Sequence, residues 1–319
     1  MRRLALAALL LLAGCGQPAG APRRVVIPEG STFRAAADSL AHKGLIRFPR
    51  IFSTYASWTG RDRVIKAGTY EFSTGDGWNG ILNALAAGRG LVHIVTIPEG
   101  WGLAKILPQL ANALDVPLES LEVAVRDTAL RRELDVPTPT VEGYLFPDTY
   151  AFSPGTTGRE AVRAMVDRFL QVWRPEWDAR ATALAMSRHD LMALASIIET
   201  EAKKAEERPV ISAVYHNRLK ARMRLQADPT VQYALGKHVT RVLFKDLEID
   251  SKYNTYKYAG LPPGPIASPG AASMEAAANP ANVPFLYFVA HPDGHHEFRR
   301  TFAEHTAAIR AVRRAAKAK

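Results

Sequence analysis

The feature that most constrains the fold is an apolar helical pattern within residues 187–217 that carries one carboxylate on its apolar face. The spacing predicts a helix over residues 191–206, with Asp190 as its N-cap. At about 100° per residue, Glu201 lies within roughly 20° of Leu194 and therefore faces inward. The pattern thus predicts a helix that carries a carboxyl group into its packed side.

The other charged residues of this helix point away from its apolar side. Glu199 lies about 140° from the apolar direction, and Lys203, Glu206 and Glu207 lie toward the same far side, where we expect them to be solvated. A carboxyl half-buried against Leu and Ile can hold a proton near neutral pH, as a general acid must. The alternative for Glu201 is a structural ion pair with an arginine.

The N-terminus is similar to a bacterial lipoprotein signal. Two arginines precede an apolar run over residues 4–13, and residues 12–15 form a small-residue cleavage site ending in Cys15, the one cysteine of the chain. We expect residues 1–15 to be this signal, Cys15 to carry lipid and residues 16–24 to be a linker. A helix over the apolar run would be about 16 Å long, short of the roughly 30 Å hydrocarbon core, and a short signal anchor is the alternative. Either reading puts the folded part outside the cytoplasm, tethered at the membrane.

The composition, 47% hydrophobic and 23% charged, is ordinary for a globular protein of one or two domains. The net charge is +10, or +8 once Arg2 and Arg3 leave with the signal. Outside the cytoplasm, such a basic surface suits anionic lipid or anionic cell-wall polymer. The sequence has no zinc-finger spacing and no aromatic nucleic-acid motif, so we expect no nucleic-acid partner.

Short strands and helices alternate over residues 25–95, which predicts a small module of the α+β class, with Ser31 capping its first helix. The sequence IPEG ends the first strand and recurs at residues 97–100, through either internal duplication or a shared turn. Residues 96–140 are predicted to be a helical connecting segment. Residues 141–319 are predicted to be a mixed helical domain.

A β-hairpin is predicted near the end of that domain, turning at Asp293 and Gly294. His291, His295 and His296 lie close to the turn, but their spacing matches no standard metal site, so we expect no metal ligands there.

Two irregular segments hold the remaining candidate residues. Residues 142–150, EGYLFPDTY, predict a fixed loop whose aromatics either contact sugars or pack in the core. Residues 253–270 combine an aromatic cluster with a Pro- and Gly-rich stretch, which is typical of a functional loop. The sequence has no Walker loop and no GxSxG elbow, and its cysteine is assigned to the lipid, so Glu201 is the leading chemical group.

The ordered motifs resemble those of the endolytic murein transglycosylases, the MltG or YceG-like family. The resemblance runs from about residue 25 to residue 309. It rests on residues 67–72, 142–150, 195–202, 216–219, 224–236, 253–256, 260–270 and 286–290.

The resemblance implies a LysM-like module at residues 25–95 and a YceG-like catalytic domain at residues 141–319, with Glu201 as the catalytic acid. The implied reaction cleaves the bond between N-acetylmuramic acid and N-acetylglucosamine in nascent peptidoglycan strands. It leaves 1,6-anhydro ends and terminates strand elongation. This is a lyase reaction that needs no cofactor and no metal. The candidate substrate-binding residues are Gln226, Asn254, Tyr256, Tyr144 and Asp148.

The family also implies a place at the periplasmic side of the inner membrane, beside peptidoglycan synthases as partners. Its members are described as held by a transmembrane helix, whereas this chain carries the lipoprotein-like signal. Gly16 is not the Asp that commonly retains lipoproteins at the inner membrane, so the outer membrane is the alternative. Two rival functions are a non-catalytic cell-wall-binding lipoprotein and a hydrolase, in which Asp228 or Glu142 would approach Glu201 as a second carboxylate.

Overall fold

The computed structural model describes residues 21–28, 30–88, 92–153, 155–236 and 242–317, and the chain divides into two compact units. Unit 1 holds the described residues up to Ile94 together with residues 150–156. Unit 2 holds residues 95–149 and the chain from Thr157 onward. The predicted signal over residues 1–15 and the start of the linker lie outside the described residues.

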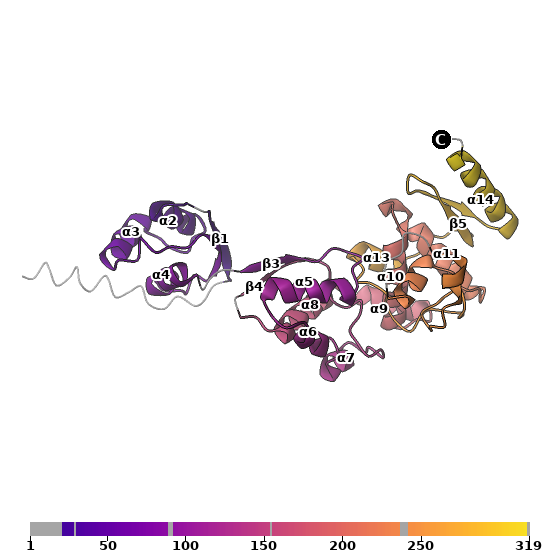
Figure 1. Ribbon diagram of the computed structural model, residues 1–319, viewed down its shortest axis with the longest axis horizontal. Helices are drawn as coiled ribbons and strands as arrows, with labels where there is room; N and C mark the ends of the chain where they lie inside the picture. Colours follow the sequence, from indigo (N-terminus) through magenta and orange to yellow (C-terminus); the bar gives the residue numbers. More distant parts are fainter. Residues whose placement is uncertain (1–20, 29, 89–91, 154, 237–241, 318–319) are drawn as a thin grey trace, which may run out of the picture. The chain divides into compact units, whose positions relative to one another are not determined.

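Unit 1 is built around an antiparallel pair of strands, with two helices in the connection between them (Figure 1). In chain order its elements are β1 (Arg23–Ile27), α2 (Phe33–His42), α3 (Pro49–Trp58), β2 (Gly68–Phe72) and α4 (Trp78–Ala87). Arg23 lies opposite Phe72 and Ile27 opposite Gly68. Alternate residues of both strands point into one core, where Val25, Ile27, Tyr70 and Phe72 are buried.

The first and last helices of unit 1 each have a clear local signal at one end. The first helix is capped by Thr32, whose hydroxyl accepts from the Ala35 N–H at 3.3 Å, so the prediction of Ser31 was wrong by one residue. Ser31 instead closes a turn by donating its backbone N–H to the Pro28 carbonyl. Helix α4 ends at Gly88, which has the left-handed conformation that favours glycine at this position.

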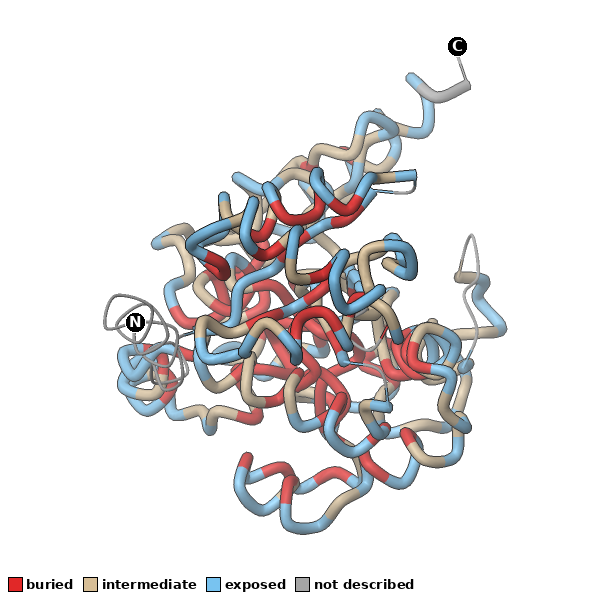
Figure 2. Tube along the Cα trace, turned by 90° about the vertical axis from the view of Figure 1, so that its left-hand side faces the viewer, coloured by how far each residue is buried: buried red, intermediate tan, exposed pale blue. Residues whose placement is uncertain are grey.

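A second pair of strands, β3 (His93–Thr96) and β4 (Thr149–Phe152), contains two of the three points at which the chain changes from one unit to the other. Between these strands, unit 2 begins with three helices, α5 (Leu103–Leu114), α6 (Leu118–Ala124) and α7 (Thr128–Glu133). Helix α8 (Gly158–Val172) packs against α5 and α6. These helices bury one apolar face each and leave their charged residues at least partly exposed. Figure 2 colours the trace of the described residues by burial, with buried residues in red and exposed residues in pale blue.

The rest of unit 2 surrounds one helix, α10 (Arg188–Glu201). It packs against α9 (Pro175–Ala183), α11 (Arg208–Lys220), α12 (Asp228–Ala234) and α13 (Ala271–Ala278). Two short 3-10 helices, η1 (Ala205–Glu207) and η2 (Phe244–Glu248), lie in the connections. Apolar packing on several sides makes α10 the central element of the unit.

The predicted hairpin is confirmed as β5 (Tyr287–Ala290) and β6 (His296–Arg299), with Ala290 opposite His296. The chain continues into α14 (Phe302–Lys317), which packs against both strands. Together, these elements confirm the predicted α+β class, with many helices and three separate two-stranded sheets among the described residues. None of the helices in the described part of the chain has the length and apolar character needed to cross a bilayer.

The loop at residues 142–150 is tied to the Pro-rich loop by a close contact at Gly143. Gly143 has φ of 84°, and a Cβ there would lie 2.3 Å from Pro265 Cβ. Gly260 has a similar φ of 86°, but a Cβ there would have no atom within 4 Å, so this position isolates the effect of backbone conformation alone.

We therefore expect Gly260→Ala to lower the free energy of unfolding by about 1 kcal/mol, through the strained backbone. We expect Gly143→Ala to lower it by about 2 kcal/mol more, because Pro265 must also move. Urea unfolding followed by circular dichroism measures both values. Equal losses in the two variants would contradict the close contact.

Candidate active site

Helix α10 begins with a reciprocal capping box. The Ser187 hydroxyl accepts from the Asp190 N–H at 3.0 Å, and the Asp190 carboxylate accepts from the Ser187 N–H at 2.9 Å. Ser187 is therefore the N-cap and Asp190 the third helical residue, so the predicted cap and the predicted range 191–206 were both wrong by several residues. The helix ends at Glu201 because Ala202 has an extended backbone.

The middle of α10 is buried on all sides rather than on one face. Every residue from His189 to Ile198 except Asp190 is buried. A helix that is apolar all round belongs inside a core, so its charged groups are confined to its two ends. Glu199 and Glu201 share the last turn and face different neighbours.

The prediction that Glu199 is solvated was wrong. Its side chain is only 7% exposed, and its Oε2 accepts from the Gly270 N–H at 3.0 Å. Its Oε1 lies 3.6 Å from Nη2 of Arg208. Gly270 is the N-cap of α13, so the Glu199 charge also lies where the dipole of that helix favours an anion. Glu199 is a structural carboxylate that joins α10 to α13.

Glu207 was also predicted to be solvated, and it too is mostly buried. Its side chain is 13% exposed, and its two oxygens accept from His296, one from the backbone N–H at 2.8 Å and one from Nδ1 at 2.7 Å. This pair holds the hairpin against the segment that follows Glu201. Lys203 and Glu206, in contrast, are exposed as predicted.

Glu201 is half-buried, and within the described part of the chain its carboxyl forms no hydrogen bond and no ion pair. Burial, and after it the negative charge of Asp228, raises its pKa to about 7, while the charges of Lys203 and Arg218 act in the opposite direction. The C-terminus of a helix also disfavours an anion. The structural ion pair with an arginine, the alternative reading of Glu201, is therefore not formed. A carboxyl with a pKa of about 7 can both donate and accept a proton near neutral pH.

A Tyr–Asp pair lies in the electrostatic neighbourhood of Glu201. The Tyr256 hydroxyl donates to Asp228 Oδ1 at 2.5 Å, and both side chains influence the charge on Glu201 or are influenced by it. Burial raises the pKa of Tyr256 first, followed by its bond to Asp228 and then by Glu201. Tyr256 thus stays a neutral donor that orients the Asp228 carboxyl beside Glu201.

Two further residues of this environment, Tyr215 and Arg218, come from α11. Tyr215 is buried, its hydroxyl has no hydrogen-bond partner among the described residues, and burial and then Glu201 raise its pKa. Arg218 donates to the Leu286 carbonyl at 2.7 Å and to the Leu225 carbonyl at 2.6 Å. These two residues were not among those predicted from the sequence. The sequence signal that could have found them is their spacing of three residues on the helix that packs beside Glu201.

Three of the five predicted binding residues lie in two loops that meet beside α12. The backbone N–H of Gln226 donates to the Thr255 carbonyl at 3.2 Å, and the Gln226 side chain is exposed. Asn254 is fully buried, donates to the carbonyls of Leu247 and Ile249 and accepts from the Tyr256 N–H. The side chains of Gln226 and Tyr256 are at least partly exposed, whereas Asn254 is buried and shapes the loop that holds Tyr256.

The structure does not bring Tyr144 and Asp148 into this group. Tyr144 is fully buried, and its hydroxyl lies 2.9 Å from Nδ1 of His189, near the other end of α10. Asp148 accepts from Nε of Arg168 at 2.7 Å and from the Thr149 N–H at 2.7 Å. The loop at residues 142–150 is therefore a packed core loop along most of its length, and Tyr144 has no surface with which to touch a sugar.

Glu142, in the same loop, is a second carboxyl whose burial raises its pKa to about 7. Unlike Glu201, it has partners, because it accepts from the Leu103 N–H at 3.0 Å and from the Tyr233 hydroxyl at 3.4 Å. It is not among the groups whose charge influences Glu201. Of the two carboxylates considered for a hydrolase, Asp228 is therefore the one near Glu201.

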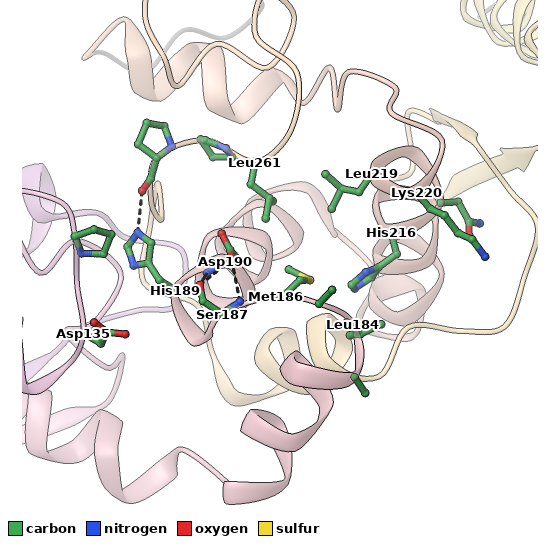
Figure 3. Close-up of a pocket in the computed structure, with 16 residues that line it drawn as sticks. Asp135, Leu184, Met186, Ser187, His189, Asp190, His216, Leu219, Lys220 and Leu261 are labelled. Atoms are coloured by element: carbon green, nitrogen blue, oxygen red, sulfur yellow. Dashed lines mark hydrogen bonds between the residues drawn. The ribbon is translucent and has the colours of Figure 1, made fainter.

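A cavity of about 1080 Å³ opens at the opposite end of α10 (Figure 3). Its lining includes Ser187, Asp190, His216, Lys220 and Leu261. From Asp190 to Glu201 the helix rises about 16 Å, so this cavity is not the surroundings of Glu201. The raised pKa of Glu201 and the size of this cavity indicate two different candidate sites. We take the surroundings of Glu201 as the candidate active site because its carboxyl can exchange a proton near neutral pH.

Comparisons with known proteins show the family to which this chain belongs. The model of the YceG-like family matches residues 25–311. The chain belongs to this family. A YceG-like relative from Bacillus subtilis, named endolytic murein transglycosylase, is 36% identical over 301 residues, which cover 88% of this chain and 82% of the relative. A relative of the same name from Streptococcus pneumoniae is 30% identical, covering 83% of this chain and 54% of its own length.

The YceG-like fold is also found in a solved structure. A crystal structure of a yceG-like protein from Listeria monocytogenes is 33% identical to this chain. It superposes with a TM-score of 0.65 and covers 90% of this chain and 98% of that one.

The raised pKa of Glu201 has a consequence for stability. The folded protein holds the Glu201 proton up to about pH 7, whereas an unfolded chain releases it near pH 4.5. The stability contributed by the raised pKa is thus complete below about pH 4.5 and lost as pH rises through about 7. Glu201→Gln keeps the shape and removes this titration.

We therefore expect Glu201→Gln to match the wild type at pH 4 and to exceed its free energy of unfolding by up to about 3 kcal/mol at pH 8. Urea unfolding across this range measures the difference. Glu206→Gln, at an exposed position, is the matched control and should show no such trend. A constant difference between Glu201→Gln and the wild type would contradict the raised pKa.

Proposed function

We propose that this protein is an endolytic lytic transglycosylase that cleaves peptidoglycan glycan strands, with Glu201 as general acid and then general base. The observation that carries the proposal is a half-buried carboxyl with a pKa of about 7 and without a hydrogen-bond partner in the described part of the chain. The chain's relatives named endolytic murein transglycosylase support the choice of substrate and reaction.

In the proposed reaction, Glu201 donates its proton to the oxygen that bridges N-acetylmuramic acid and N-acetylglucosamine, and the bond from that oxygen to C1 breaks. The C6 hydroxyl of the muramyl sugar then bonds to C1, and its proton passes to the Glu201 carboxylate. The products are a 1,6-anhydromuramyl end and a free N-acetylglucosamine hydroxyl. Because the substrate supplies its own nucleophile, the reaction needs one acid rather than the usual pair.

Asp228 is proposed to support this step electrostatically. Its negative charge favours the protonated form of Glu201 before the reaction. As positive charge develops at C1, the same carboxylate, oriented by the 2.5 Å bond from Tyr256, can stabilise it. Gln226, exposed on the neighbouring loop, is proposed to hold the sugar through its amide.

The finer assignments of the remaining chain are also proposals. Unit 1, with two helices between its paired strands, is proposed to be a LysM-like module over residues 25–95. Residues 96–140 are proposed to connect it to the catalytic domain at residues 141–319. Lipid on Cys15 is proposed to hold the protein at the periplasmic side of the inner membrane. There it would cut nascent strands beside peptidoglycan synthases and so end their elongation.

The first test is digestion of purified murein by the wild type and by Glu201→Gln, with products analysed by mass. We expect the wild type to give 1,6-anhydromuramic ends, which are one water lighter than reducing ends. Loss of a general acid lowers the rate by about 10²- to 10⁴-fold, so Glu201→Gln should be nearly inactive. Glu206→Gln is again the control and should keep its activity.

The outcomes of this digestion separate the rival functions. Reducing ends would replace the lyase with a hydrolase, in which Asp228 activates water. Full activity in Glu201→Gln would refute the assignment of the acid. Binding of murein with no cleavage by the wild type would favour a non-catalytic binding protein.

A second test uses the pH dependence of kcat/KM. Glu201 must be protonated to act as the acid, so kcat/KM should fall as pH rises through about 7. Removing the negative charge in Asp228→Asn should lower the pKa of Glu201 and move this limb to lower pH. Asp246→Asn, which changes a carboxylate that caps η2, is the control. If kcat/KM falls at the same pH in Asp228→Asn as in the wild type, the electrostatic role of Asp228 is contradicted.

A further inference from the structure

The outer face of α3 in unit 1 exposes large apolar side chains. Ile51 is 55% exposed and Trp58 is 86% exposed. Seven residues apart on a helix, their directions differ by only about 20°, so both point away from the same face. Phe48, which precedes the helix, is 51% exposed. A group of exposed apolar residues in one short segment is typical of a binding surface.

The charges of this segment are all of one sign. Residues 43–61 contain Lys43, Arg47, Arg50 and Arg61, and no aspartate or glutamate. Arg47 and Arg50 are exposed, and the guanidinium of Arg47 lies 5.5 Å from the centre of the Phe48 ring. Aromatic and aliphatic side chains combined with arginine are typical of helices that lie at the interface of an anionic bilayer.

The polar groups of α3 are poorly suited to a sugar ligand. The hydroxyls of Ser53, Thr54 and Thr59 donate to carbonyls of the helix itself, at distances of 2.9 to 3.0 Å. The nearby amide oxygen of Asn79 already accepts from Tyr55 and Arg61 at 2.9 Å each. With these hydroxyls and this amide oxygen already bonded, the face offers mainly apolar surface and cations and few free acceptors for sugar hydroxyls.

The chain length between the expected lipid and unit 1 agrees with a bilayer as the partner. Arg23, the first residue of β1, lies eight positions after Cys15. Fully extended, this stretch spans at most about 28 Å. If Cys15 carries lipid, unit 1 therefore lies within that distance of the headgroups.

We propose that the outer face of α3, formed by Phe48, Ile51 and Trp58 with Arg47 and Arg50, is a membrane-contact surface that docks unit 1 on anionic lipid headgroups. Trp58 and Ile51 enter the interfacial region, and the two arginines lie against the phosphates. This contact is independent of the chemistry of Glu201, so it can fail while the proposed activity stands.

The test uses the full chain reconstituted in vesicles of phosphatidylglycerol and phosphatidylcholine that carry bromine on their acyl chains. Bromine quenches only tryptophans that lie at the membrane, and the chain has five. We expect quenching in the wild type and loss of most of it in Trp58→Phe. Trp78→Phe, which changes a less exposed tryptophan of the same unit, should keep it. Equal quenching in the wild type and Trp58→Phe would overturn the proposal.

Charge reversal provides the second measurement. Arg47→Glu combined with Arg50→Glu should weaken the docked state about tenfold or more, seen as lost quenching of Trp58. Arg313→Glu combined with Arg314→Glu, which reverses two exposed charges on α14, is the control and should have no effect. Docking should also weaken in 0.5 M salt.

Lipid-free murein sacculi test whether the outer face of α3 binds glycan instead of lipid. Co-sedimentation of the full chain with sacculi should be the same for the wild type and for Ile51→Ser combined with Trp58→Ser. Two results together would overturn the membrane proposal. The first is weaker binding of the Ile51→Ser, Trp58→Ser variant to sacculi, and the second is unchanged quenching of Trp58 in vesicles for the Arg47→Glu, Arg50→Glu variant. The face would then be a glycan-binding surface.

Discussion

The burial of α10 on all sides is the constraint on which the candidate site depends. A helix whose middle is apolar all round can carry charge only at its ends, so both carboxylates of its last turn must be explained by what lies beyond the core. Glu199 accepts from the N–H of Gly270, the N-cap of α13, whereas Glu201 faces Asp228 and Tyr256 and remains unbonded within the described residues. Two residues apart, the same chemical group is hydrogen-bonded in one place and unbonded within the described residues in the other.

The Pro-rich segment at residues 260–270 keeps this arrangement in place. It runs along α10 and is bonded to it near both ends and in the middle. His189 pairs with the Pro263 carbonyl, the Ser196 hydroxyl accepts from the Ile266 N–H, and Glu199 accepts from Gly270. Proline lacks a backbone N–H, so a segment rich in proline and glycine has few internal hydrogen bonds and takes its shape from these contacts. The position of α13 against the end of α10 follows from them.

Much of this could be predicted from the sequence because it depends on local patterns. Strand alternation, Gly88 as a helix end and the hairpin turn at Gly294 are signals within a few residues. The inward direction of Glu201 followed from helical spacing alone. The burial of Glu199 did not, because its partner Gly270 lies 71 residues away. Tyr144 and Asn254 show the same limit, since a polar side chain in a motif looks identical whether it meets a ligand or is paired inside the core.

Because the Glu201 carboxyl has no hydrogen bond within the described residues, a variant at this position is well suited to structural work on a bound glycan. A side chain that bonds to no neighbour among the described residues can be replaced by its amide without loosening the loops around it, so Glu201→Gln should preserve the shape of the protein. An uncleaved glycan strand could then remain bound long enough to be crystallised or cross-linked. The contacts of each sugar ring, on both sides of the bond to be broken, would become directly visible.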